Sequence, residues 1–148
     1  MPPRYIGSWY HSSGLVRSLP RKSSIVATIA CNSGYTLDDI DFFRAIDGLG
    51  LAFIEQPLHH RDLIDHAELA RSIETPICLD ESVVDPFSAE QAIRIGACHY
   101  INIKPARVGG LQNAVAIHDM AREAGIPVWI GGCLLYTSDA ADERSSVD

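Results

Sequence analysis

Short apolar runs, each of which reads as a β-strand, recur along this chain about every 25 residues. The ends fall at Ala30, Glu55, Asp80 and Lys104, with steps of 25, 25 and 24 residues, and the next step reaches the Trp129 region. Helix-like patterns lie between the runs. This alternation predicts βα units with a parallel sheet, either a barrel or a doubly wound sheet. Five strands are too few for a closed eight-stranded barrel, so we expect an α/β fold that forms part of a TIM-type barrel.

Composition limits the class of protein. The chain has 148 residues, of which 47% are hydrophobic and 21% charged, which is ordinary for a globular domain. Its net charge of −7 argues against a nucleic-acid partner. The apolar runs are too short to cross a bilayer, so we expect no membrane association and a cytoplasmic location. The four cysteines show neither a CxxC pair nor zinc-finger spacing, and we interpret them as buried thiols in a reducing compartment.

The repeat divides the chain into three parts. Residues 24–132 carry the βα pattern and are predicted to form the partial barrel domain. Residues 1–23 hold no period over two turns and are left as an unassigned leader. Residues 133–148 are acidic and serine-rich without an apolar stripe, and we expect them to be disordered or foreign to the fold.

Three charged residues end successive strands of this repeat. Glu55, Asp80 and Lys104 would meet at one mouth, because the carboxyl ends of parallel strands share an edge. Two carboxylates there repel each other unless a cation separates them, and hard oxygen ligands suit Mg²⁺ or Mn²⁺. A lysine beside such a cation is a candidate base for removing a proton next to a carboxylate. The alternative is that each charged residue marks only the point where its strand reaches solvent.

Four segments in order carry a family resemblance. They are residues 53–58 (FIEQPL), 75–82 (TPICLDES), 101–110 (INIKPARVGG) and 125–132 (GIPVWIGG). Together they resemble the enolase superfamily, in its muconate-lactonising-enzyme subgroup. Within that subgroup they are most similar to the branch of o-succinylbenzoate synthases and N-succinylamino acid racemases. The resemblance runs over about two-thirds of the chain.

The resemblance implies a (β/α)₇β barrel with Mg²⁺ held by three strand-end carboxylates and a pair of acid/base lysines. Glu55 and Asp80 match the second and third metal ligands, and Lys104 matches the catalytic lysine of the sixth strand. Asn102, two residues earlier, is expected to face the same interior. Gly132 falls where the family's backbone approaches a substrate carboxylate.

The sequence also departs from the family pattern. Ala30 stands where the first metal ligand is an aspartate, and no Lys-x-Lys motif occurs near Arg4. Cys133 replaces an expected methionine, and the capping domain and remaining strands have no counterpart. We interpret the chain as an internal gene fragment with foreign or frameshifted sequence at both ends.

For the parent protein the resemblance implies a carbon–oxygen lyase or racemase acting on a small carboxylate and assembled as a homo-oligomer. The expected activity is o-succinylbenzoate synthesis for menaquinone, together with or replaced by racemisation of N-acylamino acids. A dipeptide epimerase or a muconate cycloisomerase-type enzyme is the alternative. A further alternative is that the chain as given is an inactive partial barrel.

Other residues are set aside as structural. His59, His60 and His66 lie outside the strand-end positions and are interpreted as solvated histidines. Trp129 and Phe53 are interpreted as barrel core.

Overall fold

The computed structural model describes residues 27–132, which form a five-stranded parallel sheet in the order β1-β2-β3-β4-β5. The unassigned leader and tail, with Cys133, lie outside these residues, so the three-part division stays a prediction. The strands are β1 (Thr28–Ala30), β2 (Phe53–Glu55), β3 (Ile77–Leu79), β4 (Tyr100–Ile103) and β5 (Val128–Ile130).

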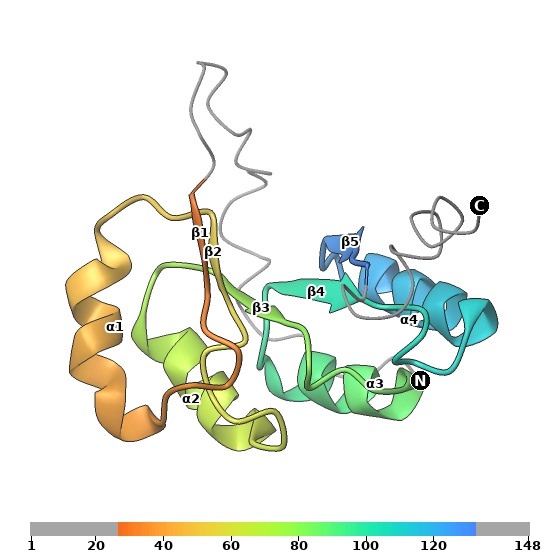
Figure 1. The fold of residues 1–148 in the computed structure, drawn as a ribbon, viewed down its shortest axis with the longest axis horizontal. Coiled ribbons are helices and arrows are strands. Elements are labelled where there is room, and N and C mark those ends of the chain that lie inside the picture. The colour runs from red at the N-terminus through yellow and green to blue at the C-terminus, as the bar shows by residue number, and fades with distance from the viewer. Residues whose placement is uncertain (1–26, 133–148) are drawn as a thin grey trace, which may run out of the picture.

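A helix follows each of the first four strands, as the repeat predicts. They are the 3₁₀ turn η1 (Leu37–Asp39) with α1 (Ile40–Asp47), α2 (Leu63–Ser72), α3 (Pro86–Ile95) and α4 (Leu111–Glu123). The helices follow one another in chain order around the outside of the sheet (Figure 1). Because every strand pair is parallel and every crossover contains a helix, the α/β class and the partial-barrel architecture are confirmed.

Local sequence signals account for the ends of α3. The Asp85 carboxylate accepts a hydrogen bond from the Ser88 N–H at 2.7 Å, and the Ser88 hydroxyl accepts one from the Asp85 N–H at 3.0 Å. Pro86 occupies the first turn, where a missing N–H costs nothing. Gly96 ends the helix with φ +70°, a left-handed conformation that other residues adopt at a cost. These signals fix where the third crossover turns back toward the sheet.

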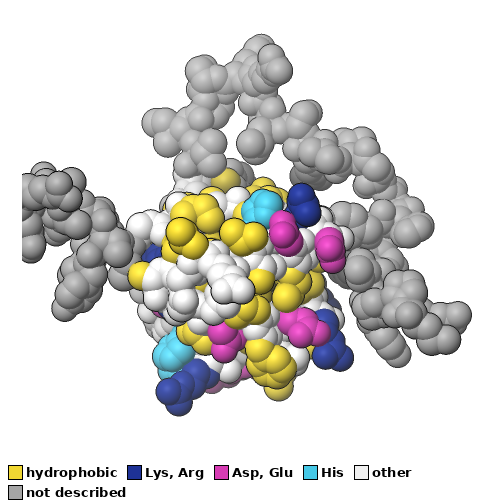
Figure 2. Space-filling view, turned by 90° about the vertical axis from the view of Figure 1, so that its right-hand side faces the viewer, with side chains coloured by type: hydrophobic (Ala, Val, Ile, Leu, Met, Phe, Trp, Pro, Cys, Tyr) yellow, Lys and Arg dark blue, Asp and Glu magenta, His cyan; other side chains and the backbone are white. Residues whose placement is uncertain are grey.

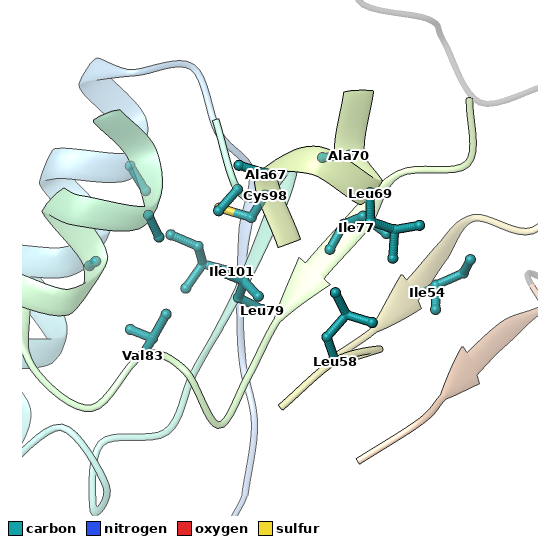
Figure 3. Packing of buried hydrophobic residues seen from close by; sticks show 14 of the residues in the cluster. Ile54, Leu58, Ala67, Leu69, Ala70, Ile77, Leu79, Val83, Cys98 and Ile101 are labelled. Atoms are coloured by element: carbon teal, nitrogen blue, oxygen red, sulfur yellow. The ribbon is translucent and has the colours of Figure 1, made fainter. Parts of the chain in front are cut away.

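The outer face of the sheet packs against the helices and forms the core. Alternate strand residues point to this side and are fully buried; they include Ile54, Ile77, Leu79, Ile101 and Ile103. Figure 3 shows Ile77, Leu79 and Ile101 in the layer between strands and helices, with Ala67 and Leu69 of α2 nearby. This continuous apolar layer holds the strands in register and so fixes the positions of their tips.

The inner face of the sheet has a different character. Phe53 and Tyr100 lie on it with ring centroids 5.4 Å apart. Trp129, which the sequence predicts to be barrel core, is 41% exposed. The reason is that β5 is an edge strand of the described sheet and has a neighbouring strand, β4, on one side only. The expectation for Trp129 is therefore wrong for the described part of the chain.

The face of the molecule that Figure 2 presents is mixed in charge. On the face presented in Figure 2, acidic and basic side chains alternate with hydrophobic ones, and neither sign gathers into a patch. Among residues 27–132, no helix combines the length and the apolar character that crossing a membrane requires.

The cysteines of the described range are free thiols. Cys78 and Cys98 are buried, as predicted, and burial raises the pKa of each to about 12. Cys31 is half-buried, and burial raises its pKa as well. These thiols stay protonated at neutral pH and are poor nucleophiles.

Candidate functional site

The predicted site residues lie at the carboxyl ends of β2, β3 and β4, on the inner face of the sheet. Glu55 is the last residue of β2 and pairs with Cys78 of β3. Cys78 in turn pairs with Tyr100. Asp80 and Asn102 come two residues further along their strands and therefore share the face of Glu55. The strand ends thus place both carboxylates on one side of the sheet.

Asp80 and Lys104 form an ion pair at this mouth. The Lys104 Nζ lies 2.6 Å from Asp80 Oδ2, and Asp80 is only 4% exposed. Sequence reasoning placed these two residues together but did not predict a second cation. The Arg107 guanidinium contacts the other carboxylate oxygen, Oδ1, at 2.5 Å.

Arg107 reaches Asp80 because the chain turns immediately after β4. The N–H groups of Arg107 and Val108 both donate to the Lys104 carbonyl, at 2.9 and 3.1 Å. This single turn brings the Arg107 side chain back over the strand end. The available signal was its position three residues after Lys104 in the 101–110 segment, one helical turn away.

Asn102 and Glu55 form the second contact of the site. The Asn102 amide donates from Nδ2 to Glu55 Oε1 at 2.9 Å, and Asn102 is 1% exposed. Its Oδ1 is buried and has no hydrogen-bond partner among the described residues. Gly131 passes so close that a Cβ there would lie 2.3 Å from this oxygen. Gly132, the predicted substrate neighbour, is exposed, and a Cβ built on it would meet no atom of residues 27–132 within 4 Å.

Cys78 links the two carboxylates electrostatically. Its pKa is raised first by burial, and the negative charges of Glu55 and Asp80 raise it further. Both carboxylates therefore act on the thiol of this residue, which lies on β3 two residues before Asp80 and pairs with Glu55 of β2. The Cys78 thiol is therefore uncharged where it lines the site, and its sulfur is not a ligand that a hard cation prefers.

The donors present suit a divalent cation only in part. Glu55, Asp80 and the unpartnered Asn102 Oδ1 are hard oxygens, the donor type that Mg²⁺ prefers. Mg²⁺ accepts one or two protein carboxylates and completes its shell with water, so these residues fit it. Ala30, which pairs with Glu55 across β1 and β2, supplies no oxygen. Accordingly, residues 27–132 hold no cluster of three acidic, histidine or cysteine ligands.

His66 corrects one expectation. It was interpreted as solvated together with His59 and His60; these two are exposed, but His66 is fully buried. The Leu58 N–H donates to His66 Nε2 at 3.3 Å, so that nitrogen carries no proton. The proton sits on Nδ1, 2.5 Å from the Asp62 carbonyl oxygen. Burial outweighs this hydrogen bond and lowers the pKa of His66.

Burial of neutral histidines predicts a loss of stability in mild acid. The pKa values of His66 and His99 are both lowered by burial, so below about pH 6.5 the unfolded chain binds protons that the folded chain does not. The free energy of unfolding should fall as pH decreases, by about 1.4 kcal/mol for each unit separating folded and unfolded pKa values. Urea unfolding between about pH 7.5 and 5.5 measures this slope.

A matched pair of variants shows how much of this pH dependence comes from His66. His66→Gln should flatten the pH dependence, whereas His60→Gln, at an exposed position, should leave it unchanged. An equal slope in the His66→Gln variant and the parent would contradict the assignment to a buried neutral imidazole.

Comparison with known proteins agrees with this architecture. Residues 23–142 match the family model described as "Enolase C-terminal domain-like". The o-succinylbenzoate synthase of Geobacillus stearothermophilus is 53% identical over 103 residues, covering 70% of this chain and 28% of the relative. The N-succinylamino acid racemase of Amycolatopsis sp. is 48% identical over 110 residues, covering 74% and 30%.

Solved structures give the same result. The dipeptide epimerase from Cytophaga hutchinsonii, complexed with Mg and the dipeptide D-Ala-L-Val, matches with a TM-score of 0.72 at 29% identity. That match covers 75% of this chain and 30% of the epimerase chain. The chain thus spans about 30% of the length of the relatives it matches. The parallel βα repeat and the match over most of its residues establish that the chain belongs to the enolase C-terminal domain-like family.

Proposed function

We propose that this chain carries part of the active site of a cation-dependent enzyme that removes a proton from the carbon next to a carboxylate. The observation that carries the proposal is the Asp80–Lys104 pair, with Glu55 on the same face, at the carboxyl ends of three adjacent parallel strands. The activity that the relatives' names favour is o-succinylbenzoate synthesis, the dehydration that serves menaquinone biosynthesis, with N-succinylamino acid racemisation as a second reaction.

Each residue has a role in this proposal. Glu55 and Asp80 would hold Mg²⁺, or Mn²⁺, and Lys104 Nζ would accept the proton from the substrate carbon. Asn102 and Gly132 would contact the substrate carboxylate. When bound, the cation supplies positive charge that stabilises the negative charge developing on the carboxylate oxygens. The buried inner face limits water around Asp80 and Asn102, which strengthens these interactions.

Dipeptide epimerisation is a second candidate. The structural match to the epimerase of Cytophaga hutchinsonii and the 39% identity to the L-amino acid-D/L-Glu epimerase of Francisella philomiragia support it. Epimerisation begins with the same proton abstraction, so the roles of Glu55, Asp80 and Lys104 would not change. The synthases and racemases named above have higher identities to this chain, 53% and 48%, and for that reason come first.

Cation binding tests the proposal directly. Calorimetric titration with Mg²⁺ or Mn²⁺ should show weak binding by the chain, loss of binding in Asp80→Ala, and at least about tenfold tighter binding in Ala30→Asp. The Ala30→Asp change places a third carboxylate opposite Glu55 in the β1–β2 ladder. Ligand charge count sets affinity at such sites, so the added carboxylate should tighten binding.

The matched control is Ala116→Asp. Ala116 is exposed on α4. The Ala116→Asp substitution therefore adds the same negative charge away from the strand ends. Equal cation affinities in Ala30→Asp, Ala116→Asp and the parent would contradict the proposed cation site.

A further inference from the structure

Gln56 joins the loops that follow three successive strands. It comes directly after Glu55 and is fully buried. Its backbone N–H donates to the Cys78 carbonyl at 2.8 Å, and its carbonyl accepts from the Ser33 N–H at 2.8 Å. Ser33 lies in the loop after β1, so the main chain of Gln56 ties the ends of β1, β2 and β3 together.

The Gln56 side chain makes three of its hydrogen bonds to the loop that carries Asp80. Its Oε1 accepts from the Asp80 N–H at 3.0 Å and from the Ser82 N–H at 3.1 Å. Its Nε2 donates to the Ser82 hydroxyl at 2.8 Å and to the Leu58 carbonyl at 3.2 Å. Backbone N–H groups only donate and carbonyls only accept, so these partners fix which end of the amide is oxygen.

His66 supports Gln56 from the other side. Its unprotonated Nε2 accepts from the Leu58 N–H and lies 3.3 Å from Gln56 Nε2. The amide therefore has acceptors for its nitrogen and donors for its oxygen. A buried polar group with all its partners is rigid, and replacement by an apolar side chain leaves those partners unsatisfied.

The backbone of Gln56 is itself unusual. Its φ is +41°, in the left-handed region that residues other than glycine rarely adopt. The surrounding hydrogen bonds hold it in that conformation. Such conformations are retained where the neighbouring structure requires them, and they gather at functional sites.

We propose that Gln56 is the positioning residue of the site: its side-chain amide holds the Asp80–Ser82 loop so that the Asp80 carboxylate faces the mouth beside Lys104. The inference rests on the proposed function in one respect, because it assigns Asp80 as a cation ligand. That the Gln56 amide holds the loop in place follows from the hydrogen bonds alone and does not depend on the proposed function. Gln56 touches neither cation nor substrate in this scheme and acts through Asp80.

Gln56→Met tests the proposal, because methionine has a similar length and volume but makes none of these hydrogen bonds. Gln112→Met, at an exposed position on α4, is the matched control. Two readouts are combined: amide hydrogen exchange by NMR and Mn²⁺ affinity. The exchange reference is the Ile101 N–H, which donates to the Pro127 carbonyl in the β4–β5 ladder, away from the loop.

In Gln56→Met, we expect exchange at the Asp80 and Ser82 amides to quicken at least about tenfold, with Ile101 unchanged within about twofold. Mn²⁺ affinity should fall about tenfold, the usual effect of losing a group that orients a ligand. Gln112→Met should match the parent in both readouts. Gln56→Glu keeps an oxygen for the two N–H groups and should restore their protection.

Unchanged protection of Asp80 and Ser82 in Gln56→Met would overturn the proposal. So would equal quickening at Ile101, because Gln56 would then support the fold in general. If the parent binds Mn²⁺ and Gln56→Met binds it equally well, Gln56 does not position the ligand and the proposed function stands. If the parent binds no Mn²⁺ while the two loop amides respond as expected, the proposed function fails and control of the loop by Gln56 stands.

Discussion

Replacement of Asp80 by alanine should lower the free energy of unfolding by about 3 kcal/mol. Asp80 is the counter-charge of both Lys104 and Arg107, whose side chains are only 17% and 21% exposed. The variant leaves two cations close together with no anion between them. Removing one partner of a buried pair costs more than the pair contributes, because the remaining charge stays poorly hydrated. Urea denaturation followed by circular dichroism measures the change.

The chain offers a matched control for this prediction. Asp41 pairs with Arg44 on the surface of α1, with its side chain 93% exposed, so Asp41→Ala should change stability by no more than about 0.5 kcal/mol. Asp80→Asn keeps an oxygen acceptor and should fall between the two. If Asp80→Ala were as stable as Asp41→Ala, the Asp80 cluster would be a solvated surface contact.

Replacement of Gly131 by alanine is the second large effect, with an expected loss of about 1 to 3 kcal/mol. The new Cβ would lie 2.3 Å from Asn102 Oδ1 and 3.0 Å from its Cγ. Asn102 is buried and its Nδ2 is bonded to Glu55, so it cannot move aside without breaking that hydrogen bond. The variant should therefore lose stability and disturb the Glu55 carboxylate together.

Gly132→Ala is the control, because a Cβ at Gly132 meets nothing within 4 Å in the described part of the chain. Its stability should stay within about 0.5 kcal/mol of the parent. Chemical denaturation gives the stability difference, and the NMR signals of the Asn102 side-chain amide report the local change. Equal stabilities of the two alanine variants would show that β5 can shift away from Asn102, and the steric argument would be wrong.

Two contacts that sequence reasoning missed join residues far apart in the chain. Arg107 contacts Asp80 across 27 positions, and Gln56 reaches Ser82 across 26. The interpretation of His66 as solvated rests on its position outside the strand ends, but it is buried in contact with Gln56 and Leu58. The prediction for Trp129 was wrong in the opposite sense, because this residue was expected to be buried and is 41% exposed. An apolar strand residue is buried only where a neighbouring segment covers it.

The sequence by itself determined the elements and their order. Apolar runs bounded by turn residues and separated by helical patterns predict parallel βα units, because helical hydrogen bonding and the side-chain periods of helices and strands follow from local sequence. The same period located the tips that carry Glu55, Asp80 and Lys104. The glycine after α3 marked its end, since only glycine adopts the left-handed conformation there at little cost.

The sequence predicted that Glu55, Asp80 and Lys104 lie at one edge of the sheet, and the tertiary structure alone decided which side-chain contacts form there. It pairs Asp80 with two cations, sets Asn102 on Glu55, places Ala30 opposite Glu55, and anchors the Asp80 loop to Gln56. Each contact joins residues more than 20 positions apart. Their distances depend on sheet register and on the turn after each strand, which packing of the whole layer sets and no local pattern encodes.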